Sequence, residues 1–349
     1  MIEHTATTTP QNIQLSTPNP FKILLTMTLY FFRAMTGAYG MSVSGFLILR
    51  LVISEEQWML IPLFNSFIHL LILPALVLVP IVVLMHRWEL LALTIAPFGA
   101  FMLWYGGGFF TTAPTIPDDA PRLSMVTFNI ASFGTNLDEF TTLIREIDAD
   151  VVLLQELGEE ASATFAEAFA ETYPYQALYP VAGRVRGQGV LSRVPILEEE
   201  AYVPYTYYQQ RLLLDLDGQE VALYNVHLVY PFANNFARRR QDVQELLARM
   251  DAESVPVIVG GDFNLTERNI EYDWMTNDYT DAYRSSARGL GWTFAPFGHL
   301  CVDNFPVCAA ARIDYFFHSA GISAASAQVW ERTAGSDHYP VRVELALVD

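Results

Sequence analysis

Two long apolar segments near the N-terminus set the strongest limit on how this chain can fold. Leu60 to Met85 and Trp88 to Phe110 each reach the ~20 residues that an α-helix needs to cross a bilayer. A third, weaker segment, Thr36 to Ile53, contains three glycines and has an arginine near its end, where a long side chain can reach the membrane surface. Pro20 to Met35 is also apolar and either lies in the interface or extends the first span. Residues 1–112 are therefore predicted to form a membrane anchor of about three transmembrane helices.

Two other interpretations of this region fit less well. A buried globular helical domain remains an alternative to a membrane anchor. A cleaved signal peptide is disfavoured, because the apolar region continues far beyond any cleavage site.

The distribution of cations predicts the orientation of this anchor. Lys22 and Arg33 precede the first span, and Arg87 separates the second from the third. The link at 54–57 and the stretch at 111–121 contain neither lysine nor arginine. Because cations accumulate on the cytoplasmic side, we expect a multi-pass protein of the cell membrane with its N-terminus in the cytoplasm and its C-terminal domain outside it. The lipid bilayer is then its first partner, and no obligate protein partner is inferred.

Composition separates the anchor from the rest of the chain. Residues 1–112 carry four basic and four acidic side chains, so the whole formal net charge of −18 lies in residues 113–349. Residues 113–121 are rich in proline and predict a short stiff linker. Residues 122–349 are enough for one domain with a large core. Its acidity argues against broad capture of nucleic acid but is compatible with a divalent cation.

Apolar periodicity predicts a mixed α/β architecture for this domain. Strands and helices alternate first, and hairpin-like strands follow, which indicates two packed sheets flanked by helices. Strands are expected around Met125–Ile130, Val151–Leu154, Gly189–Ser192, Arg211–Leu216, Val221–Leu228, Val255–Val259, Ile313–Phe317 and Val341–Leu347, and helices around Leu137–Ile147, Phe165–Phe169 and Phe236–Met250.

One strand end carries an acid and an amide together. The β-branched run Val257 to Val259 predicts a buried strand, and two glycines then allow a tight turn before Asp262 and Asn264. These two residues are two positions apart, so an extended backbone points both side chains the same way. A carboxylate and a carboxamide at the mouth of a buried strand are costly without a ligand.

Other predicted strands also end in, or are preceded by, polar residues. Ligands in α/β folds gather at strand ends, where acids and amides suit a hard cation and histidines can donate to phosphate or move protons. Each residue alone has a simpler explanation, such as a turn, a solvated acid, a core histidine or an ion pair between Asp314 and Arg312. Taken together they predict an active site, and they are Asn129, Glu156, His227, Asp314, Asp337 and His338.

These elements, in this order, resemble the endonuclease/exonuclease/phosphatase superfamily, which is DNase I-like. The resemblance covers roughly residues 122–349 and rests on Phe128-Asn129, Gln155-Glu156, Gly187 to Arg193, Asn225 to Leu228, Gly261 to Asn264, Arg312 to Tyr315 and Ser336 to His338. With the spans ahead of it, the chain is similar to membrane-anchored bacterial members. The resemblance implies a four-layer α/β sandwich and a hydrolase that cleaves phosphate esters with Mg²⁺ or Mn²⁺.

The resemblance also implies roles for the site residues. Glu156 would be the main metal ligand, with Asn129 beside it and Asp337 on the same or a second ion. Asp262 would orient or deprotonate water, and Asn264 would hold the phosphate. The remaining catalytic residues are His227, which would stabilise the phosphorus centre or the leaving group, His338, which would contact a phosphate oxygen, and Asp314, which would fix the His338 tautomer. The general base stays open.

The substrate is less constrained than the chemistry. Arg238-Arg239-Arg240 is the only cationic cluster, and its side chains would fan around a helix. Membrane tethering favours a phospholipid or an isoprenyl-linked phosphate, and an extracytoplasmic nuclease acting on DNA is the alternative. A catalytically silent binding or sensor module is a third hypothesis, which the complete set of motifs disfavours.

Two cysteines close a short loop. Cys301 and Cys308 are the only cysteines, and an extracytoplasmic location favours a disulfide between them over two free thiols. Zinc binding is disfavoured, because no histidine spacing matches a zinc site.

Overall fold

The computed structural model describes residues 19–55, 57–131, 136–182, 186–204, 207–231, 235–295 and 310–348. Within them, the C-terminal part contains two six-stranded sheets, ordered β11-β12-β1-β2-β4-β3 and β5-β6-β7-β8-β10-β9. The first sheet comprises β1 (Arg122–Asn129), β2 (Val151–Gln155), β3 (Tyr175–Tyr179), β4 (Gln188–Ser192), β11 (Ile322–Val329) and β12 (Val341–Leu347). The second comprises β5 (Ile196–Tyr202), β6 (Gln209–Leu216), β7 (Gln219–His227), β8 (Val257–Asp262), β9 (Thr280–Asp281) and β10 (Asp314–His318).

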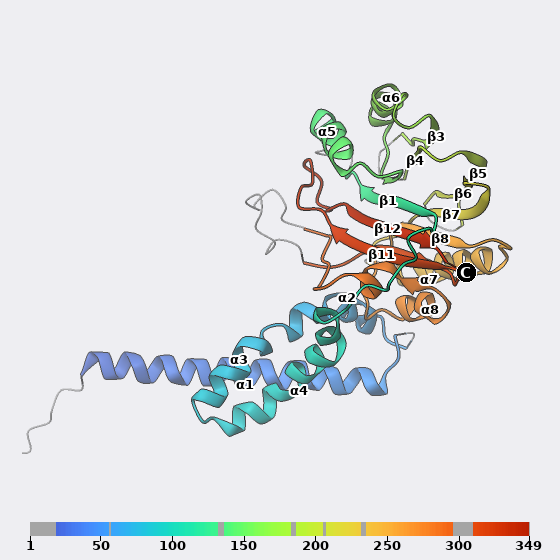
Figure 1. Cartoon of the computed structure of the whole chain (residues 1–349). Helices are drawn as coiled ribbons and strands as arrows, with labels where there is room; N and C mark the ends of the chain where they lie inside the picture. The colour runs from blue at the N-terminus through green and yellow to red at the C-terminus, as the bar shows by residue number, and fades with distance from the viewer. Residues whose placement is uncertain are drawn as a thin grey trace, which may run out of the picture.

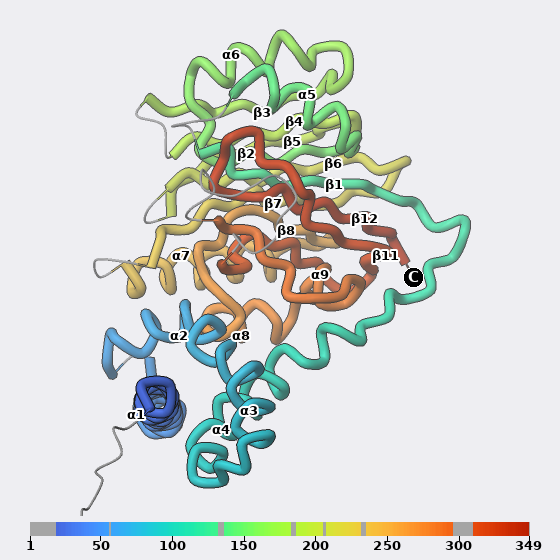
Figure 2. The backbone as a smooth tube through the Cα atoms, turned by 90° about the vertical axis from the view of Figure 1, so that its left-hand side faces the viewer, coloured from blue at the N-terminus to red at the C-terminus, as the bar shows by residue number. Residues whose placement is uncertain are grey.

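The two sheets pack face to face and helices cover their outer faces (Figure 2). α5 (Leu137–Ile147) and α6 (Glu159–Ala168) pack on the first sheet, and α7 (Asn235–Asp251) and α8 (Ile270–Asp278) pack on the second. The short helix α9 (Ala282–Ser286) follows β9. The predicted four-layer α/β sandwich is confirmed.

β8 illustrates why these strands are apolar on both sides. Ile258 contributes to the core between the sheets, whereas Val257 and Val259 pack against the helices. A strand covered on both faces buries every residue, so its sequence is a continuous apolar run rather than an alternation. All six residues of β8 are buried.

The N-terminal part consists of helices α1 (Pro20–Val52), α2 (Leu60–Ile72), α3 (Ala75–Leu84) and α4 (Trp88–Tyr105), followed by the 3₁₀ turn η1 (Gly106–Phe109) (Figure 1). Two stretches, Pro20–Val52 and Trp88–Phe109, are long and apolar enough to cross a membrane, and α2 with α3 would make a third span if this pair, bent by 42°, crosses as one unit. The two segments separated at residue 36 by sequence reasoning form one continuous helix. The segment expected as a single span over Leu60–Met85 is broken before Pro74.

These helices expose apolar side chains on a scale that the sandwich does not. Of 31 exposed large apolar residues in the described part of the chain, 27 lie between Phe21 and Phe110. α1 and α4 approach closely, because a Cβ on Gly40 would lie 2.8 Å from the Leu93 carbonyl oxygen, and Ser44 Oγ donates to the same oxygen at 2.9 Å. Small residues at such a contact are typical of helices packed in membranes.

Candidate active site

Strand direction brings all eight predicted site residues to one edge of the sandwich. β1 runs parallel to β2, and β7 runs parallel to β8, so their carboxyl ends meet there. β12 is antiparallel to β1, and β10 is antiparallel to β8. The N-terminal ends of β12 and β10 therefore lie at the same edge as the C-terminal ends of β1 and β8.

Asp262 lies at the centre of this edge and is almost fully buried. Its Oδ2 accepts hydrogen bonds at 3.0 Å from Asn129 Nδ2 and from Asn264 Nδ2, and its Oδ1 accepts one at 2.9 Å from the Asn264 amide. The Nε2 atoms of His227 and His338 lie 3.6 and 3.9 Å from Oδ2. Burial chiefly, and Asp314 to a lesser extent, raises the pKa of Asp262 to about 8.

The backbone around Asp262 uses conformations that most residues avoid. Gly261 has φ +146, and a Cβ there would lie 1.9 Å from the Val226 carbonyl oxygen, so only glycine fits. Glu156 and Asn264 have φ values of 60 and 50. Such conformations cost roughly 1–3 kcal/mol each and persist where the surroundings enforce them, often at functional sites.

His338 is held by two carboxylates. Its Nδ1 lies 3.0 Å from Asp314 Oδ2, and its backbone N–H donates to Ser336 Oγ at 3.0 Å. Burial alone would lower the pKa of His338, but Asp314 and Asp262 raise it to about 10. With a proton on both ring nitrogens, Nε2 is a donor directed toward Asp262 and toward any anion bound beside it.

His227 lies in a different environment. Its peptide group exchanges two hydrogen bonds with the Gln209 side chain, and its ring lies 4.8 Å from that of Tyr207. Burial, and then the charge of His338, lowers the pKa of His227 to about 3. Its Nδ1 is buried without a hydrogen-bond partner within the described ranges. The surroundings therefore shift the pKa values of the two histidines in opposite directions, that of His227 downward and that of His338 upward.

The acidic groups at this edge are suited to a hard cation. Glu156 Oε1 lies 3.4 Å from Asn129 Nδ2, and Asp337, about half exposed, lies 4.0 Å from His338 Nε2. The expected ligands Asn129, Glu156 and Asp337 thus border the buried cluster of Asp262, Asp314 and His338, whose ligand atoms lie within 4.8 Å of one another. This oxygen-rich donor set fits Mg²⁺ or Mn²⁺.

Some polar residues next to the site hold the fold together. Gln155 and Asn225, which belong to the sequence motifs, hydrogen-bond to each other at 2.7 Å and connect the two sheets below the site. Arg312 does not pair with Asp314 but with Glu267 and Asp281. The arginine cluster is not a cationic patch, because Arg239 is buried against Glu271.

Sequence reasoning missed three contacts of the site. Gln209 holds the His227 backbone, the Thr293 hydroxyl accepts a hydrogen bond from the Asp314 N–H at 3.2 Å, and Phe294 packs on the His338 ring. These residues come from distant segments and carry no motif, so no local pattern could have found them. The predicted disulfide between Cys301 and Cys308 lies outside the described residues and stays a prediction.

Comparison with known proteins agrees with this geometry. Residues 126–338 match the model of the Endonuclease/Exonuclease/phosphatase family, and the chain belongs to that family. The fold is the DNase I-like α/β sandwich of this family, whose members are typically phosphoester hydrolases. A search of curated protein sequences found no match.

Several solved structures share the fold. The endonuclease/exonuclease/phosphatase from Beutenbergia cavernae is 21% identical with a TM-score of 0.56, covering 65% of this chain and 72% of that one. A humanized TDP2 from D. rerio is 18% identical with a TM-score of 0.54, covering 65% and 99%. A mannosyl-6-phosphatase from Bacteroides thetaiotaomicron is 18% identical with a TM-score of 0.51, covering 64% and 100%. These identities are too low to transfer a substrate.

Proposed function

We propose that this protein is a membrane-anchored, divalent-metal-dependent phosphoesterase whose catalytic domain lies outside the cytoplasm and acts on a lipid-linked phosphate. The observation that carries the proposal is that the catalytic domain is docked on helices whose exposed surface is apolar. In Figure 1, β1 ends on the side toward which the N-terminal half of α1 extends. If α1 crosses the bilayer, the site edge is directed toward the membrane.

The charged residues of the helices fit one bilayer. Arg33 forms an ion pair with Glu89 at 3.2 Å, and both side chains are about half exposed. The 20 residues from Arg33 to Val52 would extend about 30 Å, which matches the hydrocarbon thickness. Val52 and Phe109 would then both end near the outer surface, where the catalytic domain begins.

The site residues divide the work of phosphate-ester cleavage. Glu156, Asn129 and Asp337 would hold Mg²⁺ or Mn²⁺, which neutralises charge on the phosphate when bound. Asp262 would orient the attacking water, and Asn264 would hold a phosphate oxygen. His338 would donate from Nε2 to a phosphate oxygen, while Asp314 accepts from Nδ1 and fixes the orientation of the ring. His227 would stabilise the leaving group.

The test is a substrate panel on the full chain in nanodiscs, with Mg²⁺, with Mn²⁺ and with EDTA. The panel contains phospholipids, isoprenyl phosphates, a soluble phosphodiester and DNA at matched phosphate concentration. We expect metal-dependent hydrolysis, abolished by EDTA, that is fastest on a bilayer-presented phosphate. Faster cleavage of DNA would favour the nuclease alternative, and binding without turnover would favour a silent module.

A further inference from the structure

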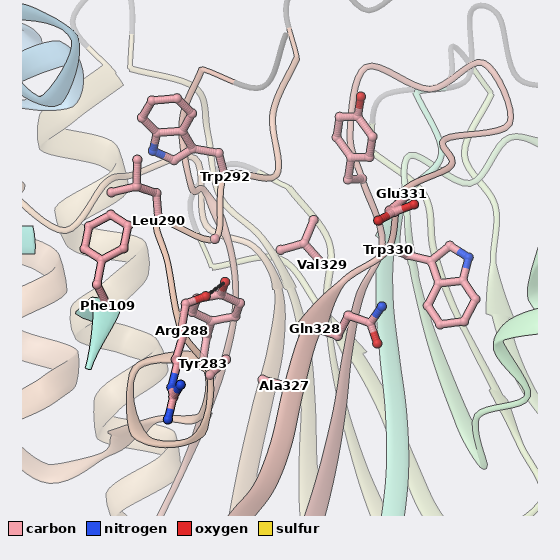
Figure 3. A pocket seen from close by; sticks show the side chains of 13 residues that line it. Phe109, Tyr283, Arg288, Leu290, Trp292, Ala327, Gln328, Val329, Trp330 and Glu331 are labelled. Atoms are coloured by element: carbon pink, nitrogen blue, oxygen red, sulfur yellow. Dashed lines mark hydrogen bonds between the residues drawn. The ribbon is translucent and has the colours of Figure 1, made fainter. Parts of the chain in front are cut away.

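A groove of about 660 Å³ lies between the end of the membrane anchor and the sandwich (Figure 3). Its size is within the ~300–1,000 Å³ range of sites for small ligands. Most of its wall is aromatic or aliphatic, and the side chains that matter here are Phe109, Leu290, Trp292, Val329 and Tyr339.

One wall of the groove belongs to the anchor. Phe109 is the last residue of the candidate span Trp88–Phe109 and is 43% exposed. Leu290, on the same side of Figure 3, packs against the apolar cluster that α1, α2 and α4 form. The apolar lining therefore begins at the exposed end of this candidate span and continues to Leu290.

Another wall is shared with the catalytic site. Phe294 pairs with His338 as an antiparallel bridge, and the Tyr339 N–H donates to the Thr293 carbonyl at 2.7 Å. Neighbouring side chains of an extended segment point to opposite faces. His338 faces the site and Tyr339 lines the groove, so the short segment that leads into β12 separates the two.

We propose that this groove binds a hydrocarbon chain of a membrane phospholipid and so presents the lipid's phosphate to the site. The chain would enter at Phe109 from the outer leaflet and lie between Leu290 and Trp292 on one side and Val329 on the other (Figure 3). This inference rests on the proposed function, because it names the part of a lipid substrate that this protein recognises.

The charged side chains of the groove lie at its solvent-exposed rim, as binding of an amphiphilic lipid requires. Arg288 and Glu331 are exposed, and Arg288 Nε donates to the Thr111 carbonyl at 2.9 Å. Polar groups at the rim and apolar groups along the walls match an amphiphile, whose chain is buried while its head group stays hydrated. A water-soluble phosphate ester would gain nothing from these walls.

The first experiment blocks the groove in the full chain, in nanodiscs. Ala327 and Val329 line it from β11, so Ala327→Trp should fill it and Val329→Asn should place an amide against the chain. The matched control is Ser326→Trp, on the same strand but exposed and outside the lining. Each variant is assayed on a vesicle phospholipid and on a soluble phosphodiester.

We expect both groove variants to lose about tenfold or more of the activity on phospholipid, since even one methylene in an apolar pocket is worth roughly 10–200-fold in discrimination. Activity on the soluble diester should change less than about twofold, and Ser326→Trp should change neither. Equal losses on both substrates, or no loss on phospholipid, would overturn the proposal.

A second measurement does not depend on turnover. Nanodiscs containing a phospholipid with a diazirine in its acyl chain are irradiated with the wild type, and the adducts are mapped by mass spectrometry. Adducts at Leu290, Trp292 or Val329 that Ala327→Trp abolishes would support the groove. Adducts confined to α1, α3 and α4, or a cross-linked second copy instead, would refute it. If no substrate is hydrolysed, the proposed function fails while this measurement still judges the groove.

Discussion

Asp262 connects the parts of the site. It accepts from Asn129 and Asn264, and it faces both histidines. Its raised pKa reflects burial next to another acid, which is the situation that a bound cation relieves. Asp262 and Glu156 are therefore expected to differ in what they do, although both are carboxylates within reach of Asn129.

Two substitutions separate these roles. Glu156→Gln should weaken Mg²⁺ affinity, because it removes a ligand charge while keeping the size of the side chain. Asp262→Asn should lower kcat by about 10²–10⁴, the usual effect of losing a positioned acid-base group, and change metal affinity less. Metal titrations of activity and calorimetry of the full chain measure both. An unchanged metal affinity in Glu156→Gln would remove it as the main ligand.

Arg312, beside the site, stabilises the fold through a buried charge network. It donates to Asp281 Oδ1 at 3.0 Å and also contacts Glu267, while Tyr272 donates to Asp281 at 2.7 Å. Burial alone would raise the pKa of Glu267 and Asp281, but Arg312 holds the pKa of both below their usual range.

Arg312→Met should destabilise the protein by about 3–5 kcal/mol, because it leaves the buried Asp281 carboxylate without its cation and Glu267 with Arg284 alone. Arg332→Met is the control, since Arg332 pairs with Glu146 on the surface and such pairs contribute ~0–1 kcal/mol. Thermal unfolding of the full chain in detergent measures both. Equal decreases in Tm would show that the buried network of Arg312 contributes no more to stability than the surface ion pair of Arg332.

The same network predicts the acid response. Because the folded pKa values of Glu267 and Asp281 are lowered, the native state binds fewer protons than the unfolded chain. The stabilisation that these two carboxylates contribute is fully present above their pKa values in the unfolded chain, ~4. It is lost as the pH falls through their lower pKa values in the folded protein. The Tm of the wild type should therefore fall below about pH 4, and more steeply than that of Arg312→Met. A parallel decline would contradict this source of acid sensitivity.

At the scale of elements, α2 holds the loop that follows the Asp262 strand. Asn269, in this loop, is fully buried and donates to the Pro62 carbonyl at 3.1 Å, and Ser66 donates to Asn269 Oδ1 at 3.2 Å. Thr266 donates to the Asn65 carbonyl at 3.2 Å. The N-terminal helix α2 thus supports the segment that runs from Asn264 into α8.

Asn269→Ala should lower both Tm and kcat, because it removes the contact with α2 and leaves the buried Thr266 N–H without its acceptor, Asn269 Oδ1, at a cost of about 1–3 kcal/mol. Asn277→Ala, on the exposed face of α8, is the matched control and should change neither. Activity on a soluble phosphodiester and thermal unfolding provide the readouts. A normal kcat in Asn269→Ala would show that α2 does not position the catalytic loop.

The elements also show what a sequence can predict. Polar residues at the ends of β1, β2, β7 and β8 could be assigned to one site because parallel strands end at one edge, and α5 and α7 follow apolar periodicity closely. The course of Leu60–Met85 could not be predicted. Hydropathy does not report the hydrogen bonds of Asn65 and Ser66 with Thr266 and Asn269. Because of these bonds, one face of α2 packs on the catalytic domain and does not face lipid.

At the scale of the whole molecule, the two parts of the chain have opposite surfaces. The helices expose apolar side chains, whereas residues 113–349 carry the whole net charge of −18. An acidic domain gains nothing from anionic polymers in solution. If the N-terminal helices lie in a bilayer, as proposed, they would fix the domain beside a high local concentration of lipid phosphate, so recognition would not need a basic surface.

The orientation of the molecule gives the last prediction. α1 and α4 run in the same direction, since Arg33 pairs with Glu89 and Arg50 packs on Trp104 at 4.7 Å. Their N-terminal ends carry Lys22, Arg33 and Arg87, so the positive-inside bias places these ends in the cytoplasm. Protease added to intact spheroplasts should then digest residues 113–349 while an N-terminal tag stays protected.

A cytoplasmic protein that remains intact in the same sample shows that the membrane is sealed. Arg33→Gln with Arg87→Gln should reduce the fraction of molecules whose domain is accessible, because both cations that retain the inner ends are lost. A domain that is protected until the membrane is opened would place the site in the cytoplasm. In that case the lipid substrate would have to come from the inner leaflet, although the geometry that presents it to Asp262 would be the same.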